Sequence, residues 1–344
     1  MTTLALAVLI IAACYAAVET VRRLALRRGM LDVPVARSSH EVPTPRGGGI
    51  VIVGATVLAP LLAAGLGVGR LALAVGAWIG GGTAIALVGW LDDIRSLSSR
   101  TRLLIQVSAA VLLVAVAGCW SQLELPVAGR VPLGWAGCAL ALLWIVGMTN
   151  AYNFMDGIDG IAAGQAVVAG AAWALIGRSA GSGAVTAIGA AIALSAAAFL
   201  LHNRPPARIF MGDVGSGFLG YTFAALPLLL AADGGTVDSG RLPVVGAAVV
   251  WPFLFDATFT FIRRLARGEN VFEGHRSHVY QRLVIAGASH AQVSTLYVAW
   301  ALISSALGVL WLWGWPGAGP FLLGWTLLSV AGVLAGVRVR ERRP

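Results

Sequence analysis

The feature that most constrains this chain is a series of about eleven long apolar stretches separated by short polar segments. A helix needs about 20 mostly apolar residues to cross a bilayer, and these stretches come close to or reach that length. The expected spans lie near residues 2–20, 47–68, 71–91, 103–120, 132–150, 160–177, 183–201, 215–232, 242–262, 292–313 and 318–337. Composition agrees, because 58% of the residues are hydrophobic and only 11% are charged. The sequence therefore predicts an all-α fold, a polytopic transmembrane helix bundle forming one integral domain over residues 1–344.

The arginines, which supply all 24 basic residues, divide unequally between the two sets of alternating loops. The poorer set holds only Arg70, Arg130, Arg178 and Arg241. Cytoplasmic loops of membrane proteins carry the excess of arginine. We therefore expect the N-terminus outside and the C-terminus inside, which requires an odd number of spans. Because this topology accounts for the net charge of +9, nucleic acid is not an expected partner.

The N-terminal apolar run admits two interpretations. The start MTTLALAVLIIAAC resembles a lipoprotein cleavage site ending at Cys14, but it lacks a basic n-region, and Arg22 and Arg23 follow it. An uncleaved first transmembrane helix is therefore favoured.

The three cysteines, Cys14, Cys119 and Cys138, are odd in number and show no CxxC spacing, so we expect neither a disulfide framework nor a zinc site.

The stretch NAYNFMDGIDG, which begins at residue 150, places a polar residue at every third position. These residues are Asn150, Asn153, Asp156 and Asp159. On an intact helix each step of three residues turns 300°, so Asn150 and Asp159 would point to opposite sides. Gly157 and Gly160 weaken a helix here, and we expect it to end or loosen so that the four side chains face one ligand. The alternative is a polar turn between two spans.

Two further motifs carry acids at expected cytoplasmic helix ends. WLDDIRSLSSRTRLLIQ holds the neighbouring Asp92 and Asp93, followed by Arg102; the alternative interpretation is a solvated helix end. FMGDVGSGFLG brackets Asp213 with glycines and continues to Ser216. An aspartate at a helix start is often only an N-cap, yet such a start also exposes backbone N–H groups to phosphate. A proton or ion pathway would more often place its carboxylates near the bilayer midplane.

The fourth motif, GHRSHVYQRL, lies in the longest expected inner loop and contains His275, Arg276 and His278. Histidines three residues apart can bind zinc, but no third ligand is near in the sequence. Arginine and histidine beside carboxylates suit an anionic phosphate better. The alternative is a basic segment that lies on anionic lipid. Asp256 falls within a span, where an acid is a functional candidate by default, and we expect it to face the same site.

Together these residue types indicate phosphoryl transfer at the cytoplasmic membrane surface. Carboxylates with asparagine oxygens suit a hard cation, and Mg²⁺ prefers few protein oxygens plus substrate phosphates. Such chemistry needs mainly positioning and charge neutralisation. The membrane location indicates that one substrate is a lipid.

The four motifs, in this order on a polytopic chain, resemble those of the polyprenyl-phosphate N-acetylhexosamine-1-phosphate transferases, glycosyltransferase family 4. The resemblance covers residues 38–287 approximately. It implies transfer of an N-acetylhexosamine 1-phosphate from a UDP-N-acetylhexosamine to undecaprenyl phosphate, with release of UMP and dependence on Mg²⁺ or Mn²⁺. It also implies a multi-pass protein of the bacterial inner (cytoplasmic) membrane with its active site on the cytoplasmic face. The oligomeric state stays open, with a homodimer as one alternative.

The resemblance assigns roles to individual residues. The expected catalytic residues are Asp92, Asp93, Asp156, Asp159, His275 and His278. The expected nucleotide- or substrate-binding residues are His40, Arg46, Arg102, Asn150, Asn153, Ser216 and Arg276. The expected metal ligands are Asp213 and Asp159. Within these sets, the paired aspartates would engage or deprotonate the lipid phosphate, and the histidines would lie near the diphosphate.

Departures from the family pattern point to one branch of it. Arg102 stands where the family often has lysine, and arginine does not titrate, so a proton-transfer role at this position is in doubt. HRSHVYQ is not the histidine-rich run of the peptidoglycan-precursor branch, and there is no triple aspartate. Both differences resemble the branch that initiates O-antigen and related envelope polysaccharides. A phospho-N-acetylmuramoyl-pentapeptide transferase is the alternative, and a membrane transporter or lipid flippase is the rival from another class.

Overall fold

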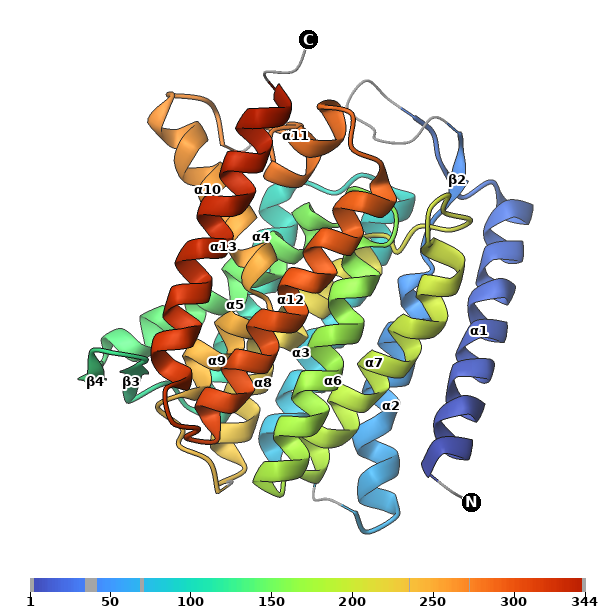
Figure 1. The fold of residues 1–344 in the computed structure, drawn as a ribbon. Coiled ribbons are helices and arrows are strands. Elements are labelled where there is room, and N and C mark those ends of the chain that lie inside the picture. Colours follow the sequence, from blue (N-terminus) through green and yellow to red (C-terminus); the bar gives the residue numbers. More distant parts are fainter. Residues whose placement is uncertain (1–2, 35–41, 69–70, 235, 272, 342–344) are drawn as a thin grey trace.

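The computed structural model describes residues 3–34, 42–68, 71–234, 236–271 and 273–341 (Figure 1). The helices in these ranges are α1 (Thr3–Arg28), α2 (Gly49–Gly65), α3 (Leu73–Ile94), α4 (Ser99–Ala117), α5 (Ala136–Met155), α6 (Ile161–Ala180), α7 (Gly183–Asn203), α8 (Asp213–Ala232), α9 (Leu242–Val249), α10 (Trp251–Ala266), α11 (Val279–Ile285), α12 (His290–Leu312) and α13 (Ala318–Glu341). Two small antiparallel strand pairs lie in the segments between helices. β1 (Leu31–Asp32) pairs with β2 (Thr44–Pro45) between α1 and α2, and β3 (Gln122–Leu125) pairs with β4 (Gly129–Pro132) between α4 and α5.

The predicted polytopic bundle of apolar helices is confirmed. Nine of the described helices are long and apolar enough to span a membrane: α1, α3, α4, α5, α6, α7, α8, α12 and α13. The pair α9–α10 passes the same test together, and α2 is shorter, at 17 residues. Each of the predicted stretches therefore corresponds to a helix or to the α9–α10 pair.

The stretch expected to form one span at 242–262 is divided in the structure into two helices, α9 and α10, which the sequence pattern does not predict. The axes of α9 and α10 differ by 84°. Pro252 lies in the first turn of α10 and cannot donate a backbone hydrogen bond to the preceding turn. Phe253 N–H, the expected helical donor to Val249, donates to the C=O of Val250 at 3.1 Å. The C=O of Val249 accepts hydrogen bonds from Gln165 Nε2 at 2.9 Å and Ser305 Oγ at 3.5 Å. A helix break at membrane depth is tolerated when neighbouring helices supply such partners.

Helix α8 is the centre of the bundle. In its most apolar window 94% of the residues are buried, against 11% for α1 and α13. It packs against α2, α3 and α5, and glycines allow close approach, since a Cβ on Gly220 would lie 2.5 Å from the C=O of Met148 in α5. Small residues serve this purpose in membrane helix pairs. The start of α8 is thereby held between helices from three other parts of the chain.

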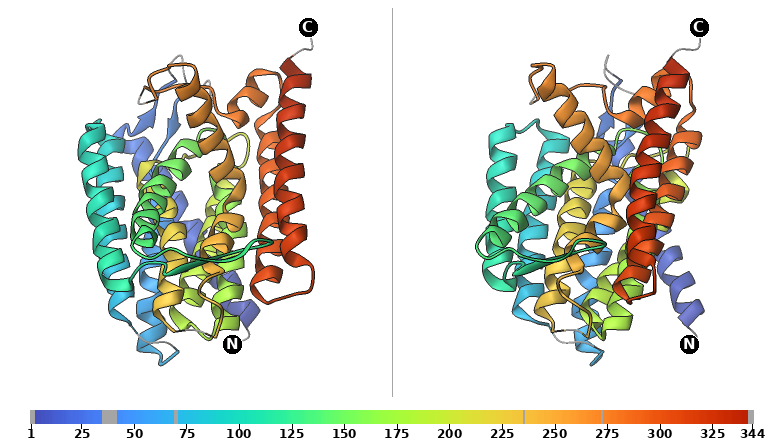
Figure 2. Two further views of the ribbon diagram at one scale, coloured as in Figure 1. Left: turned by 90° about the vertical axis from the view of Figure 1, so that its left-hand side faces the viewer. Right: turned by 60° about the vertical axis from the view of Figure 1, so that its left-hand side comes forward.

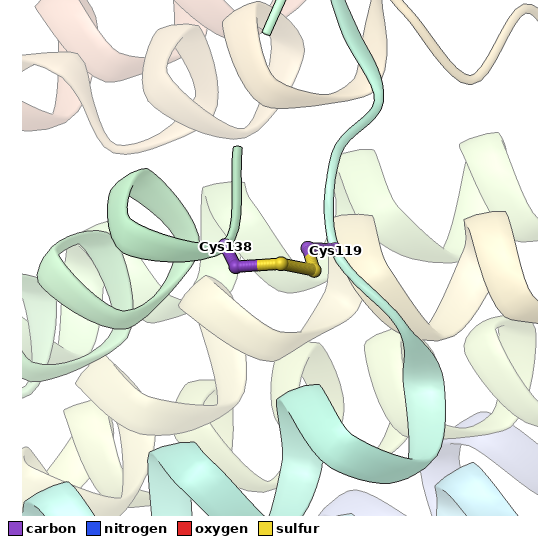
Figure 3. The surroundings of a disulfide bond; sticks show 2 residues. All are labelled: Cys119 and Cys138. Carbon is purple, nitrogen blue, oxygen red and sulfur yellow. A yellow bond between two sulfur atoms is a disulfide. The ribbon is translucent and has the colours of Figure 1, made fainter. Parts of the chain in front are cut away.

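A disulfide joins Cys119, after α4, to Cys138, in the first turn of α5, with a Cα–Cα distance of 4.8 Å (Figure 3). The expectation of no disulfide is therefore wrong. The odd number of cysteines misled it, because Cys14 is buried in α1 and takes no part. The bond closes the segment that contains the β3–β4 hairpin, which runs across the side of the bundle at a steep angle to the helices (Figure 2).

The two ends of the bundle differ in character. The described chain begins at one end and finishes at the other (Figure 1). The N-terminal end of the bundle carries the β3–β4 hairpin and α9, whereas the other end carries α10, α11 and the β1–β2 pair (Figures 1 and 2). The starts of α4, α8 and α12 and the ends of α3 and α5 also meet at this second end, where the four motifs lie.

Candidate active site

The N-terminus of α8 is capped by an aspartate from the end of α3. Asp93 is 5% exposed, and its Oδ1 and Oδ2 accept the backbone N–H groups of Asp213 (3.1 Å) and Val214 (3.3 Å). Gly212 allows this contact, because a Cβ there would lie 2.5 Å from Asp93 Oδ2. A side chain distant in sequence thus satisfies the free donors of a helix start. Of the two interpretations of this helix start, these two N–H groups are capped by an aspartate and do not face a phosphate.

Arg46 reaches the same aspartate from the segment before α2. Its Nη1 lies 3.9 Å from Asp93 Oδ1, and its Nη2 donates to the C=O of Asp93. Backbone hydrogen bonds fix the segment, since Phe210 N–H donates to Pro45 C=O at 2.8 Å and Gly48 N–H donates to Phe210 C=O at 3.0 Å. The segments before α2 and before α8 are therefore paired beside the acids.

A single guanidinium bridges two of the expected acids. Arg102 Nη1, from the first turn of α4, lies 2.9 Å from Asp92 Oδ2 and 3.6 Å from Asp213 Oδ2. Asp92 Oδ1 accepts the N–H of Leu97 at 2.5 Å, which fixes the turn between α3 and α4. Because arginine keeps its charge at all relevant pH values, it neutralises part of the negative charge here.

The asparagines of NAYNFMDGIDG connect α5 to α8 and α4. Asn153 Nδ2 donates to Asp213 Oδ1 at 2.8 Å and to Ser216 Oγ at 2.9 Å. Asn150 Nδ2 donates to Gln106 Oε1 of α4 at 2.7 Å. The structure therefore brings Asn153, Asp213 and Ser216 together directly, and Arg102 joins Asp92 to them.

The helix ends inside this motif, as the sequence predicts. α5 stops at Met155, and α6 starts at Ile161 after Gly160, whose φ is 80°. Asp156 follows α5 and is half-buried. Its pKa is raised well above the usual range by burial and by the carboxylates of Asp213, Asp93 and Asp159. Acids from three separate motifs are therefore close enough to oppose one another's ionisation, and a cation among them would relieve this repulsion.

Asp159 has structural contacts of its own. Its Oδ2 accepts the N–H of Ala207 at 3.0 Å and lies 3.4 Å from His290 Nδ1, and its C=O accepts Ser294 Oγ at 2.7 Å. Sequence reasoning missed His290 and Ser294, because they belong to the first turns of α12 and no motif surrounds them. These contacts tie the α5–α6 loop to the segment after α7 and to α12. The expected catalytic and metal-binding roles of Asp159 stay predictions.

The histidine motif forms a second group beside the acids. The rings of His275 and His278 stack with centroids 4.9 Å apart. Burial, together with the neighbouring His278 and Arg264, lowers the pKa of His275 to about 4. It is therefore neutral near pH 7 and contributes hydrogen bonding to this group instead of charge. Its Nδ1 already contacts Ser277 Oγ at 2.9 Å.

Tyr280 holds the two groups together. Its hydroxyl donates to the C=O of Phe154 at 3.1 Å, and the Phe154 and His278 rings lie 6.2 Å apart. A Cβ on Gly157 would lie 2.0 Å from the Tyr280 hydroxyl, so any larger residue there would displace the tyrosine ring. The histidine loop therefore sits against the end of α5, next to Asp156. Arg276 is half-buried in the same loop, and His40 lies outside the described residues.

The acidic and amide side chains of the site offer oxygen ligands, which suit Mg²⁺ or Mn²⁺. Among the described residues, no group of three or more histidine, cysteine or acidic side chains is arranged to hold a metal ion by itself. The Arg102 guanidinium forms ion pairs with both Asp92 and Asp213, and the carboxyl group of Asp156 lies near Asp213. Mg²⁺ is commonly held by one or two carboxylates plus substrate phosphates, which fits such a site.

Comparisons with known proteins agree with these motifs. The model of the family described as glycosyl transferase family 4 matches residues 75–231. A Bacillus subtilis protein named a probable undecaprenyl-phosphate N-acetylglucosaminyl 1-phosphate transferase is 36% identical over 84% of this chain and 80% of its own length. A Mycobacterium tuberculosis decaprenyl-phosphate N-acetylglucosaminephosphotransferase is 32% identical over 83% and 76%. A Synechococcus phospho-N-acetylmuramoyl-pentapeptide-transferase is 33% identical over 68% and 70%.

Proposed function

Because the chain belongs to glycosyl transferase family 4, we propose that it transfers an N-acetylhexosamine 1-phosphate from a UDP-sugar to undecaprenyl phosphate and releases UMP. This step would begin the synthesis of an envelope polysaccharide of the O-antigen kind. One observation carries the proposal: Asn153 and Arg102, from two different motifs, both contact Asp213 of a third motif at the start of α8. They form an oxygen-rich site with a fixed positive charge beside it.

The lipid acceptor needs little help to become a nucleophile. The second pKa of a phosphate monoester is about 6, so the acceptor phosphate is already largely a dianion near pH 7. Its main requirement is therefore a partner that offsets its charge beside the acids. Arg102 is 38% exposed at its side chain and stands between Asp92 and Asp213, where it can meet that phosphate. The paired acids would then orient the arginine and the acceptor.

The donor diphosphate needs charge neutralisation. Mg²⁺ held by Asp213, with Asp156 nearby, would withdraw charge from the phosphate that is attacked. Asn153 orients Asp213 through its hydrogen bond. His278, with His275 stacked on it, lies beside the end of α5, where its ring would hydrogen-bond substrate groups next to the diphosphate. The lipid phosphate would attack the UDP-sugar directly, or it would attack an aspartyl-phosphate intermediate formed in a first step. Release of UMP in the absence of the lipid acceptor distinguishes the two routes, because only the second route allows it.

We propose that the site faces the cytoplasm, with the N-terminus outside. The unequal arginine distribution supports this orientation. The disulfide lies at the opposite ends of α4 and α5 from Arg102 and Asn153, and disulfides persist on the oxidising side of a bacterial inner membrane. The exposed Trp135 and Trp315 also lie towards that end, as expected of aromatic side chains at a membrane interface.

The test is an assay of the purified protein in detergent with undecaprenyl phosphate and a set of donors. UDP-GlcNAc, UDP-QuiNAc, UDP-FucNAc and UDP-MurNAc-pentapeptide are compared for UMP release, with Mg²⁺, with Mn²⁺ and with a chelator. We expect metal-dependent release from an N-acetylhexosamine donor. Turnover of the pentapeptide donor alone would favour the peptidoglycan-precursor reaction, and no turnover of any donor would reject the transferase proposal.

A further inference from the structure

Asp256 is the most completely hydrogen-bonded acid in the described chain, although it lies inside α10 with its side chain 0% exposed. Oδ1 faces His278 Nδ1 (3.1 Å), Val279 N–H (2.8 Å) and Thr260 Oγ1 (3.2 Å), and Oδ2 accepts Tyr280 N–H (2.9 Å) and Tyr297 O–H (2.7 Å). Burying a carboxylate is costly unless its lone pairs are satisfied. A carboxylate has about four such positions, so its acceptor capacity here is fully used.

These contacts determine which nitrogen of His278 carries the proton. An ionised carboxylate only accepts hydrogen bonds, so the ring nitrogen that faces it, Nδ1, must be the donor. Among the described residues, the resolved side-chain partner of the ring, Asp256, faces Nδ1 and not Nε2. The tautomer of a histidine is set by the hydrogen bond of one nitrogen, and this choice leaves the other free for a ligand. His278 Nε2 then carries a lone pair and can accept a hydrogen bond from the substrate side.

The same carboxylate fixes the position of the ring. His278 is the residue before α11, and the two N–H groups that Asp256 accepts, from Val279 and Tyr280, are the first of that helix. The ring is stacked with those of His275 and Tyr280, and the tilted Phe154 ring lies 6.2 Å away. The histidine therefore has little freedom to turn about its side-chain bonds.

The broken span explains how a residue of α10 reaches this position. The 84° bend between α9 and α10 redirects the chain, and Asp256 lies in the second turn after it. The far end of α10 holds the rest of the histidine loop, because Arg264 contacts Glu269 Oε2 at 2.9 Å and the C=O of Asn270 at 2.7 Å. α10 is thus the support for the histidine loop along most of its length.

We infer that Asp256 is a positioning residue, which holds His278 as the Nδ1–H tautomer, so that the Nε2 lone pair accepts a hydrogen bond from a proton-bearing group of the bound substrates or of their water. The inference rests on the proposed function for the identity of the substrate. The hydrogen-bonded pair itself does not depend on it. The role differs from that of Asp92, Asp156 and Asp213, because Asp256 touches no substrate and acts through the histidine.

The test combines spectroscopy with kinetics. The protein is labelled with ¹⁵N-histidine, and His278 is assigned by comparison with His278→Gln. We expect wild-type His278 to carry its proton on Nδ1 and Asp256→Asn to lose this tautomer. In the same variant kcat should fall roughly 10- to 100-fold, which is the usual effect of removing the residue that hydrogen-bonds and orients a functional histidine. The KM for the UDP-sugar should change little.

Tyr297→Phe is the matched control, because it removes a donor from the same carboxylate but from the oxygen that does not face His278. It should lower thermal stability and leave the tautomer and kcat close to wild type. An equal loss of kcat in Tyr297→Phe would show that Asp256 acts only through stability and would overturn the inference. A proton on Nε2 of His278 in the wild-type protein would also overturn the inference, and this measurement does not depend on the folding of the Asp256 variant. The tautomer is measured without substrate. A protein that fails to catalyse the proposed reaction can therefore still show whether Asp256 and His278 are hydrogen-bonded in this way.

Discussion

Asp213 connects more of the site than any other single residue. Its carboxylate meets Asn153 and Arg102, and its backbone N–H meets Asp93. Only the carboxylate contacts are lost in Asp213→Ala, since the backbone donor remains. We therefore expect α8 to stay in place while the charge that would hold the metal disappears. Activity should fall at least about 100-fold, the usual effect of removing one strong electrostatic contact at a reacting phosphate or acyl group.

The matched control for this substitution is Asp233→Ala, at the opposite end of the same helix. Asp233 is exposed and ends α8, so its loss should leave turnover unchanged. Both variants are compared by UMP release and by thermal unfolding in detergent. Full activity in Asp213→Ala, with the fold intact, would contradict the assignment of the metal.

Arg102 occupies the place of a cation between Asp92 and Asp213. A divalent ion at these carboxylates must therefore compete with the guanidinium. We expect Arg102→Gln to bind Mn²⁺ more tightly in the absence of nucleotide, by roughly two- to fivefold, because a partly exposed ion pair contributes up to about 1 kcal/mol. Turnover should fall in the same variant, since the acceptor phosphate loses its partner.

Mn²⁺ binding is followed by electron paramagnetic resonance, with Arg100→Gln as the control. Arg100 is exposed in the same turn of α4. Equal or weaker Mn²⁺ binding in Arg102→Gln would show that the arginine does not compete with the metal.

At the scale of elements, the contact between α11 and the end of α5 depends on one glycine. A Cβ on Gly157 would lie 2.0 Å from the Tyr280 hydroxyl and 3.0 Å from its Cζ. Gly157→Ala should therefore destabilise the protein by about 1–3 kcal/mol, as overpacking of a well-packed contact does. Adding Tyr280→Phe removes the closest atom and should restore part of the loss, which thermal unfolding of the single and double variants measures. Additive effects of the two substitutions would contradict this contact.

The sequence predicts the elements better than their contacts. Apolar runs of membrane length identify the helices because the bilayer itself imposes that length, and the glycines at 157 and 160 correctly predict the end of α5. The break before α10 is hidden, since a single proline in an apolar run does not distinguish a bend from a straight span. The capping of α8 by Asp93 is hidden as well, because it joins residues 120 positions apart. Asp256 was a candidate from its membrane depth, but its partners depend on the bend.

At the scale of the whole molecule, the disulfide and the site lie at opposite ends of α4 and α5. Removing the bond through Cys119→Ala with Cys138→Ala should lower stability by about 3 kcal/mol on the chain-entropy account of a loop of this length. Turnover should change little, because the acids are held by contacts at the far end. Thermal unfolding and UMP release are measured on the same preparations. Loss of turnover with unchanged stability would show that the two ends are coupled.

The central claim is that the residues gathered at the start of α8 cleave the donor between its two phosphates and pass the sugar phosphate to a polyprenyl phosphate. The most direct measurement uses a UDP-N-acetylhexosamine labelled with ³²P at the phosphate next to the sugar, together with undecaprenyl phosphate. The account predicts that the label moves into the lipid while unlabelled UMP is released, and that Asp213→Ala prevents both. Label that stays in UDP while the sugar alone reaches the lipid, or a lipid that gains no label at all, would contradict it.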